Sequence, residues 1–205
     1  MKLCSTATSP YGRLARMVRI LKGLDERVLF EVVKTRGVDN PFYEVNPSGR
    51  VPCLVLDDGT ILEDSALVCW FLDNIDDMPT LHAPEGMAGL EQRRLEAMAR
   101  SMFDGISLWA REYLYRDREQ RSDVIINHER DRALRMADAF EKEVLGDVMT
   151  GPINMAQLTL VCVLHGRPNG SPNGFTWQDD RPNLNTWINR IGQVPAISDT
   201  VPPPR

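Results

Sequence analysis

A proline at the entrance of a short apolar run most constrains what this chain can fold into. Val51-Pro52 precedes the apolar residues 53–56, and such a run is typical of a buried strand. Because proline has no N–H to donate to a sheet, it must lie at a strand start, at an edge or in a special turn. A cis Val51-Pro52 bond is one such solution. It would turn the backbone of Val51 outward, where its N–H and C=O can pair with an extended, peptide-like ligand.

A hairpin and a helix are expected after this proline. Asp-Asp-Gly at residues 57–59 predicts a tight turn between the run 53–56 and the short β-rich segment 60–62,. Asp64 and Ser65 then open a helix whose apolar residues recur at helical spacing, namely Leu67, Val68, Phe71, Leu72 and Ile75,. The helix start offers N–H groups and a hydroxyl that suit a ligand carboxylate, and Asp64 offers an acceptor for a ligand ammonium. An ordinary N-cap beside an ordinary turn explains the same pattern, because such helix starts are common.

The segment before the proline alternates strand and helix. Residues 2–5 predict a strand, and Ser9-Pro10 predict the N-cap and first residue of a helix that ends at Gly23,. Residues 28–33 are nearly all apolar and predict a second strand covered on both faces,. A strand, a helix and a second strand imply a parallel pair. With the hairpin and its helix, residues 1–77 predict a β-α-β-α-β-β-α, thioredoxin-like α/β domain.

The rest of the chain shows helical patterns. Turn-forming residues predict a linker at 78–86, and we expect an all-helical domain at 87–205,. Residues 87–116 and 123–145 predict long helices, and residues 152–165, apolar after Asn154, predict a buried central helix,. Asn154 and Gln157 form a capping-box pattern at its start. Residues 166–175 predict a loop from their composition.

Composition excludes several classes of protein. With 24 basic and 29 acidic residues the net charge is −5, which favours neither nucleic acid nor an anionic membrane as a partner. No run approaches the ~18 apolar residues of a membrane span, and the first residues lack the apolar core of a secretion signal. The 4 cysteines are scattered without a Cys-x-x-Cys motif, so reduced thiols in a cytoplasmic protein fit better than disulfides. The 3 histidines show no ligand spacing, so no metal is expected.

The Val-Pro strand entrance, the Asp-Asp-Gly turn and the Asp-Ser helix start together resemble the glutathione-binding half of glutathione S-transferases (GSTs). Ser-Pro-Tyr at 9–11 with Arg13 resembles the serine-type members of that family, and residues 180–202 resemble the C-terminal end of bacterial ones. The resemblance, to a bacterial serine-type cytosolic transferase, therefore spans essentially the whole chain. It implies the GST fold, a thioredoxin-like domain followed by an all-α helical bundle. It also implies a homodimer in which the first domain of one subunit meets the helical domain of the other.

The resemblance assigns roles at a glutathione site. It implies that Pro52 is cis, that Val51 holds the cysteinyl backbone of glutathione, and that Asp64 and Ser65 hold its γ-glutamyl end. Arg50 is expected to assist. Glutathione is then a co-substrate, and no metal is implied.

Ser9 stands where thioredoxin-like proteins place their reactive group. A glutathione thiol with a reference pKa of ~8.5 is only slightly ionised at neutral pH, and the thiolate is the nucleophile. A hydroxyl that donates to the sulfur, beside a helix N-terminus and a cation such as Arg13, favours the thiolate. A role as the N-cap of the helix alone would also explain a serine at position 9. The other candidates for the hydroxyl that activates the thiol are Ser5, Thr6, Thr8 and Tyr11.

The implied function is conjugation of glutathione to an electrophilic, mostly apolar small molecule, as in detoxification. The candidates for the acceptor site are Tyr11, Met102, Trp109 and Tyr113, although Met and aromatic residues at helical spacing usually pack in a core. Two alternatives stay open. One is a glutathione-dependent isomerase or thiol-redox enzyme on the same fold, of which redox chemistry is disfavoured because residue 9 is not cysteine. The other is a non-catalytic GST-like binding protein.

Overall fold

A computed structural model describes residues 1–166, 172 and 174–203. Of the loop predicted at 166–175, residues 167–171 and 173 therefore lie outside the described residues. The chain divides into two compact units. The first contains Met1–His82 together with Pro195–Pro203, and the second contains Ala83–Val194.

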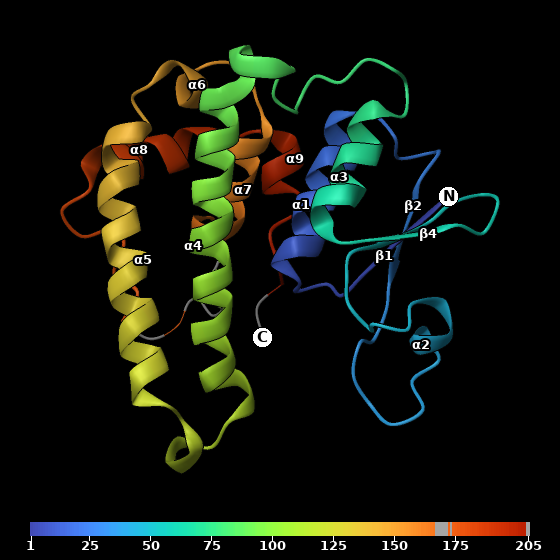
Figure 1. Ribbon diagram of the computed structural model, residues 1–205, viewed down its shortest axis with the longest axis horizontal. Helices are drawn as coiled ribbons and strands as arrows, with labels where there is room; N and C mark the ends of the chain where they lie inside the picture. Colours follow the sequence, from blue (N-terminus) through green and yellow to red (C-terminus); the bar gives the residue numbers. More distant parts are fainter. Residues whose placement is uncertain (167–171, 173, 204–205) are drawn as a thin grey trace. The chain divides into compact units, whose positions relative to one another are not determined.

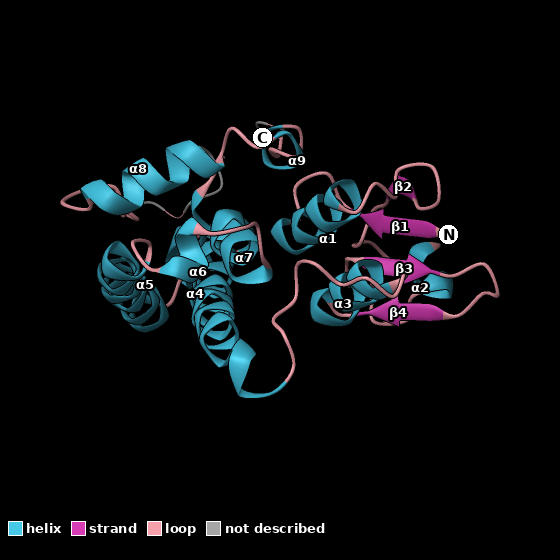
Figure 2. Ribbon diagram, turned by 90° about the horizontal axis from the view of Figure 1, so that it is seen from above, coloured by secondary structure: helices cyan, strands magenta, loops and turns pink. Residues whose placement is uncertain are grey.

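The first unit is built on a four-stranded mixed sheet. Its strands are β1 (Lys2–Ser5), β2 (Leu29–Val32), β3 (Cys53–Val55) and β4 (Ile61–Glu63), in the order β2-β1-β3-β4 (Figure 2). β1 and β2 are parallel, whereas β3 is antiparallel to both β1 and β4. With α1 (Pro10–Leu21), α2 (Phe42–Val45) and α3 (Ser65–Asn74), the predicted β-α-β-α-β-β-α order is confirmed.

The two faces of this sheet bury different residues. Successive residues of a strand point to opposite faces, so Leu3 and Leu54 share one face while Cys4 and Cys53 share the other. All four are buried, and Cys4 and Cys53 form a cluster with Phe42 of α2. α1 and α3 pack against each other and lie side by side (Figure 1).

The expectation that the second strand is covered on both faces is wrong. β2 is an edge strand that pairs only with β1, and the side chains of Leu29 and Val32 are 62% and 61% exposed. An apolar run is buried only where other elements cover both faces of the strand, and three of the four residues of β2 are exposed. Glu31, paired with Lys2 at 2.8 Å, places charge on this edge, which discourages pairing with other chains.

The second unit is helical, as predicted. Its helices are the 3-10 helices η1 (Gly86–Gly89) and η2 (Arg118–Gln120), and α4 (Leu90–Tyr115), α5 (Asp123–Glu143), α6 (Asp147–Thr150), α7 (Met155–Leu164) and α8 (Pro182–Ile191). α4 packs against both α5 and α7. Every residue of α7 is buried, which confirms the predicted central helix. Its capping box is half formed, because Asn154 accepts from the N–H of Gln157 (3.2 Å) while the Gln157 side chain donates to Val148 O (2.8 Å).

A last short helix, α9 (Pro195–Ser198), packs on α1 of the first unit. Arg13 of α1 is buried, and its guanidinium donates to the carbonyl of Ile197 (2.9 Å) and to the hydroxyl of Thr200 (3.3 Å). Residues 195–203 thus group with the first unit, whereas the sequence expectation assigned all of 87–205 to the helical domain. The domain boundaries themselves stay a prediction.

Asp73 anchors the beginning of the interdomain connection to α3. Its buried carboxylate accepts hydrogen bonds from the N–H groups of Thr80 (3.0 Å), Leu81 (3.1 Å) and His82 (2.9 Å), and the His82 ring nitrogen Nδ1 lies 2.8 Å away. Burial raises the pKa of Asp73, but these hydrogen bonds outweigh it and the pKa lies below its ordinary value. Residues up to 82 therefore belong structurally to the first unit.

We predict that Asp73→Asn lowers the free energy of unfolding by ~2–4 kcal/mol, because an amide replaces one acceptor oxygen by a donor that faces the N–H groups. Since the pKa of Asp73 is depressed in the folded state, its contribution is present above the unfolded pKa and is lost as the pH falls through the folded value,. The difference between wild type and variant should therefore shrink below pH ~3.9. Urea denaturation at several pH values measures the loss of unfolding free energy and its dependence on pH. The control Asp77→Asn, at an exposed residue with φ 56°, should be nearly neutral, and equal stabilities of the two variants would contradict the prediction.

Candidate functional site

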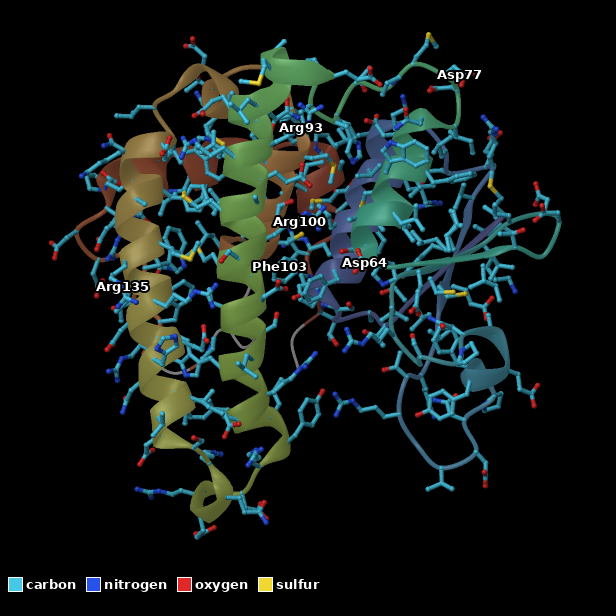
Figure 3. All side chains as sticks on the ribbon, viewed as in Figure 1. Asp64, Asp77, Arg93, Arg100, Phe103 and Arg135 are labelled. Atoms are coloured by element: carbon cyan, nitrogen blue, oxygen red, sulfur yellow. The ribbon has the colours of Figure 1, made fainter. Side chains whose placement is uncertain are left out.

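The strand register of the first unit brings the start of β3, the end of β4 and the end of β1 to the same end of the sheet. Cys53 pairs with Glu63 across β3 and β4, so Pro52 and Asp64, the next residues outward, lie at the end away from the hairpin turn. Cys53 also pairs with Cys4 across β3 and β1, so the loop that follows β1 leaves from this end as well. Figure 3 labels Asp64 where β4 passes into α3.

The Val51-Pro52 bond is cis, as the sequence predicts. The loop before it is held by the side chain of Asn46, which is 3% exposed. The amide nitrogen of Asn46 donates to the carbonyl of Arg50 (3.0 Å) and to Glu63 Oε2 (2.7 Å), and its oxygen accepts from the N–H of Ser48 (3.2 Å). Because the Arg50 carbonyl belongs to the peptide group that joins Arg50 to Val51, Asn46 orients the backbone that enters the cis bond.

Glu63 was not identified from the sequence, although it lies between the two halves of the site. Its Oε2 accepts from the hydroxyl of Ser48 as well as from Asn46. The hydrogen bonds from Ser48 and Asn46, together with the nearby charge of Arg50, hold the pKa of Glu63 below its ordinary value. Its position just before the Asp-Ser pair is the only sequence signal, and it does not reveal the partners in the 46–50 loop.

Asp64 and Ser65 begin α3. Asp64 has a φ of 74°, which non-glycine residues seldom adopt and which often marks a functional position. One oxygen of its exposed carboxylate accepts from the N–H of Ala66 (2.7 Å), and among the described residues this is its sole hydrogen-bond partner. The Ser65 side chain is buried beside it, and its hydroxyl has no partner within the described part of the chain. An oxygen of Asp64 and the Ser65 hydroxyl thus stand available at a helix N-terminus.

Ser9 is the N-cap of α1, with Pro10 at the first helical position. Its hydroxyl oxygen accepts from the N–H of Gly12 (3.1 Å), which leaves the hydroxyl hydrogen able to donate. A Cβ on Gly12 would lie 1.7 Å from the hydroxyl oxygen of Ser5, so glycine allows the first turn of α1 to approach β1.

The rival hydroxyls differ in accessibility. Ser5 is fully buried and donates to the carbonyl of Thr6 (3.2 Å), a position that suits packing better than contact with a ligand. Thr6, Thr8 and Tyr11 are half-buried, as is Ser9. All four, Ser5 included, remain alternatives to Ser9 for the thiol-activating hydroxyl.

Arg13 donates to the segment that contains α9. The guanidinium of Arg13 therefore has a structural role in the core of the first unit. The additional role predicted for Arg13, favouring a thiolate beside Ser9, stays a prediction.

The acceptor-site candidates of the helical unit occupy core or half-buried positions. Met102 and Trp109 are fully buried, and Trp109 meets Phe175 edge to face with ring centroids 6.0 Å apart. Tyr113 is half-buried, with the Arg121 guanidinium 4.7 Å from its ring centroid. Met102 and Trp109 thus lie where core residues lie, and a substrate-binding role for the four candidates stays a prediction.

The cysteines are all free and buried. Burial raises the pKa of Cys53 to about 11 and also raises the pKa of Cys4, so these thiols stay protonated at neutral pH. Among the described residues, no group of three or more His, Cys, Asp or Glu side chains is placed to hold a metal ion. Within the same residues, no helix is both long and apolar enough to cross a membrane.

Comparison with known proteins identifies the class to which this architecture belongs. Residues 8–75 match the family model described as the glutathione S-transferase N-terminal domain. The chain is 26% identical over 204 residues to the uncharacterized GST-like protein YibF of Escherichia coli K12, covering 99% of each. A crystal structure of a glutathione transferase family member from Pseudomonas fluorescens Pf-5 with bound glutathione superposes with a TM-score of 0.88, at 26% identity and 98% coverage of both chains.

A glutathione S-transferase from Methylobacillus flagellatus KT with bound glutathione has the same fold, with a TM-score of 0.82 at 24% identity over 98% of this chain and 99% of that one. A thioredoxin-like unit followed by a helical bundle is thus the architecture of glutathione transferases. Residues 8–75 thus carry the N-terminal domain of glutathione S-transferases, and the described chain has the fold of the glutathione transferase structures it resembles.

Proposed function

We propose that this protein is a cytoplasmic, serine-type glutathione transferase that conjugates glutathione to an electrophilic, mostly apolar small molecule. One observation carries the proposal. The strand register brings Val51-Pro52, the Asp64-Ser65 helix start and the loop that leads to Ser9 to the same end of one sheet. The glutathione bound in the Pseudomonas fluorescens relative supports this choice of ligand.

Each group at this end of the sheet suits one part of glutathione. The backbone of Val51, which precedes the cis bond, pairs with the cysteinyl backbone as an added strand does. The carboxylate oxygen of Asp64 that does not cap α3 receives the γ-glutamyl ammonium, and Ser65 with the N-terminus of α3 receives the γ-glutamyl carboxylate. Arg50 adds a cation on the same loop.

The hydroxyl of Ser9 acts on the sulfur. It accepts from the Gly12 N–H and donates its own hydrogen to the glutathione sulfur, which lowers the free energy of the thiolate relative to the thiol. The thiol proton passes to solvent and a sulfur–carbon bond forms. The electron pair of the broken bond departs with the leaving group or moves into the acceptor.

A redox role is the weaker alternative. Residue 9 is a serine, and the protein's own thiols are buried with raised pKa values at Cys4 and Cys53, so a mixed disulfide with glutathione is disfavoured. Assays of glutathione with a panel of electrophiles separate the remaining classes. A transferase consumes glutathione, an isomerase needs it without consuming it, and a binding protein does neither.

We predict that Asp64→Ala weakens glutathione binding by ~1–3 kcal/mol, the range for losing one partner of a charged group. Isothermal titration calorimetry of the full chain measures the change. The control Glu26→Ala removes an exposed carboxylate before β2, at the other end of the sheet, and should leave affinity unchanged. Equal affinities of wild type and Asp64→Ala would remove Asp64 from the site.

We predict that Ser9→Ala lowers turnover while glutathione affinity stays nearly constant, because the contact with sulfur is the one contact with glutathione that the change removes. The pKa of the bound thiol, titrated by thiolate ultraviolet absorbance, should rise by about 1–2 units, the equivalent of ~1.4–2.7 kcal/mol. Ser9→Thr keeps both a hydroxyl and an N-cap and should restore most of the activity. Full activity and an unchanged thiol pKa in Ser9→Ala would instead direct attention to Ser5, Thr6, Thr8 or Tyr11.

We also propose a homodimer, with α3 in the interface. Leu67 and Trp70 of α3 are 44% and 52% exposed, and closed two-fold dimers are the commonest oligomers. Light scattering at micromolar concentration should give the mass of two chains, and Trp70→Glu should shift it toward one. Val124→Glu, which alters an exposed apolar residue of α5, is the matched control. A wild-type mass of one chain would refute the dimer.

A further inference from the structure

We infer that Glu63 is a positioning residue, which holds the two halves of the candidate glutathione site at a fixed separation. One half is the backbone of Val51 and the other is the Asp64-Ser65 helix start. The inference rests on the proposed function, and it assigns to Glu63 no contact with the substrate.

The backbone of Glu63 belongs to the helix-start half. Glu63 is the last residue of β4 and pairs with Cys53 of β3, and Asp64 follows it directly. A short strand and the start of α3 therefore hold the main chain on both sides of Glu63. Its side chain projects from a rigid point, which is what a positioning group requires.

The side chain of Glu63 reaches the Val51 half. One oxygen of the carboxylate accepts from both Asn46 (2.7 Å) and Ser48. These hydrogen bonds have an ionised acceptor, so they are stronger than those between neutral groups. The 46–50 loop is in this way bound to the strand that precedes the Asp-Ser pair.

The partners of Glu63 in turn hold both sides of the Arg50 backbone. Asn46 donates to the Arg50 carbonyl (3.0 Å), and the Ser48 hydroxyl accepts from the Arg50 N–H (3.1 Å). The Arg50 carbonyl lies in the peptide group that leads into Val51, so a shift of either partner would tilt the N–H and C=O of Val51. The path from Glu63 to the proposed ligand contact thus contains two hydrogen bonds.

The charged and titratable groups around Glu63 come from two elements. Arg50 lies in the loop and adds an attractive charge, while the buried thiol of Cys53 lies on the paired strand. The charge of Arg50 near an exposed carboxylate contributes little by itself. The hydrogen bonds to Asn46 and Ser48 are therefore the contacts that carry the positioning role.

The test uses Glu63→Gln in the full chain, with steady-state kinetics in which glutathione is varied. Glutamine keeps the shape of glutamate and one acceptor oxygen but loses the charge, so Asn46 and Ser48 no longer donate to an ionised acceptor. The KM for glutathione should rise about tenfold, the equivalent of ~1.4 kcal/mol. The kcat at saturating glutathione and the pKa of the bound thiol should stay near wild type, because the Ser9 contact is intact.

Two further variants sharpen the result. Glu31→Gln removes a carboxylate of the same sheet that is ion-paired with Lys2, and it should leave the KM unchanged. Ser48→Ala alone should raise the KM for glutathione. Combined with Glu63→Gln it should add less than its separate effect, because the two residues act through the same hydrogen bond.

The outcomes separate this inference from the proposed function. If wild type binds glutathione and Asp64→Ala weakens binding while Glu63→Gln keeps the wild-type KM, the positioning role is refuted and the proposed function stands. A fall in kcat that matches a loss of folded protein, with an unchanged KM, refutes it as well, because it shows a purely structural role. A wild-type chain that binds no glutathione overturns both.

Discussion

The antiparallel pairing of β3 with both β1 and β4 determines where the candidate groups of the first unit lie. A slip of one residue would exchange the two faces of a strand. It would move Leu54 from the face it shares with Leu3 to the face where Cys4 and Phe42 are buried. Because both faces bury apolar side chains, such a slip is costly, and the same register sets which strand ends meet. Burial of the core thus determines the geometry of a site in which Asp64 is exposed and Ser65 is buried.

The features of this site that were predicted from the sequence are those that depend on residues adjacent in the chain. Ser9-Pro10 predicts a helix start because a hydroxyl and a proline suit those two positions, and Val51-Pro52 predicts a special turn because proline cannot donate to a strand. The structure has both features. Glu63 and Asn46 meet across 17 positions of the chain, and Arg13 meets Thr200 across 187. Only the tertiary fold brings these pairs together, so spacing along the sequence gave no signal for them.

An apolar pattern predicted burial correctly where only one arrangement can remove its side chains from water. The helix α7 is apolar on all sides and is wholly buried, because no arrangement on a surface would cover it. The run that forms β2 was misjudged, since an apolar strand of this length fits either a sheet interior or an edge, and its place in the sheet is a property of the whole fold. Trp109 and Met102 illustrate the same ambiguity on a helix, where an apolar position serves a core or a ligand equally well until its burial is known.

The contacts of Arg13 with Ile197 and Thr200 also concern the order in which this protein acquires its structure during synthesis. Domains generally fold as they leave the ribosome, N-terminal first. Here α1, made early, carries a buried guanidinium whose acceptors include groups near the end of the described chain, and a buried cation without acceptors is costly. The first unit therefore cannot complete its core until residue 200 has been translated. The part of the protein synthesised first is among the last to be finished.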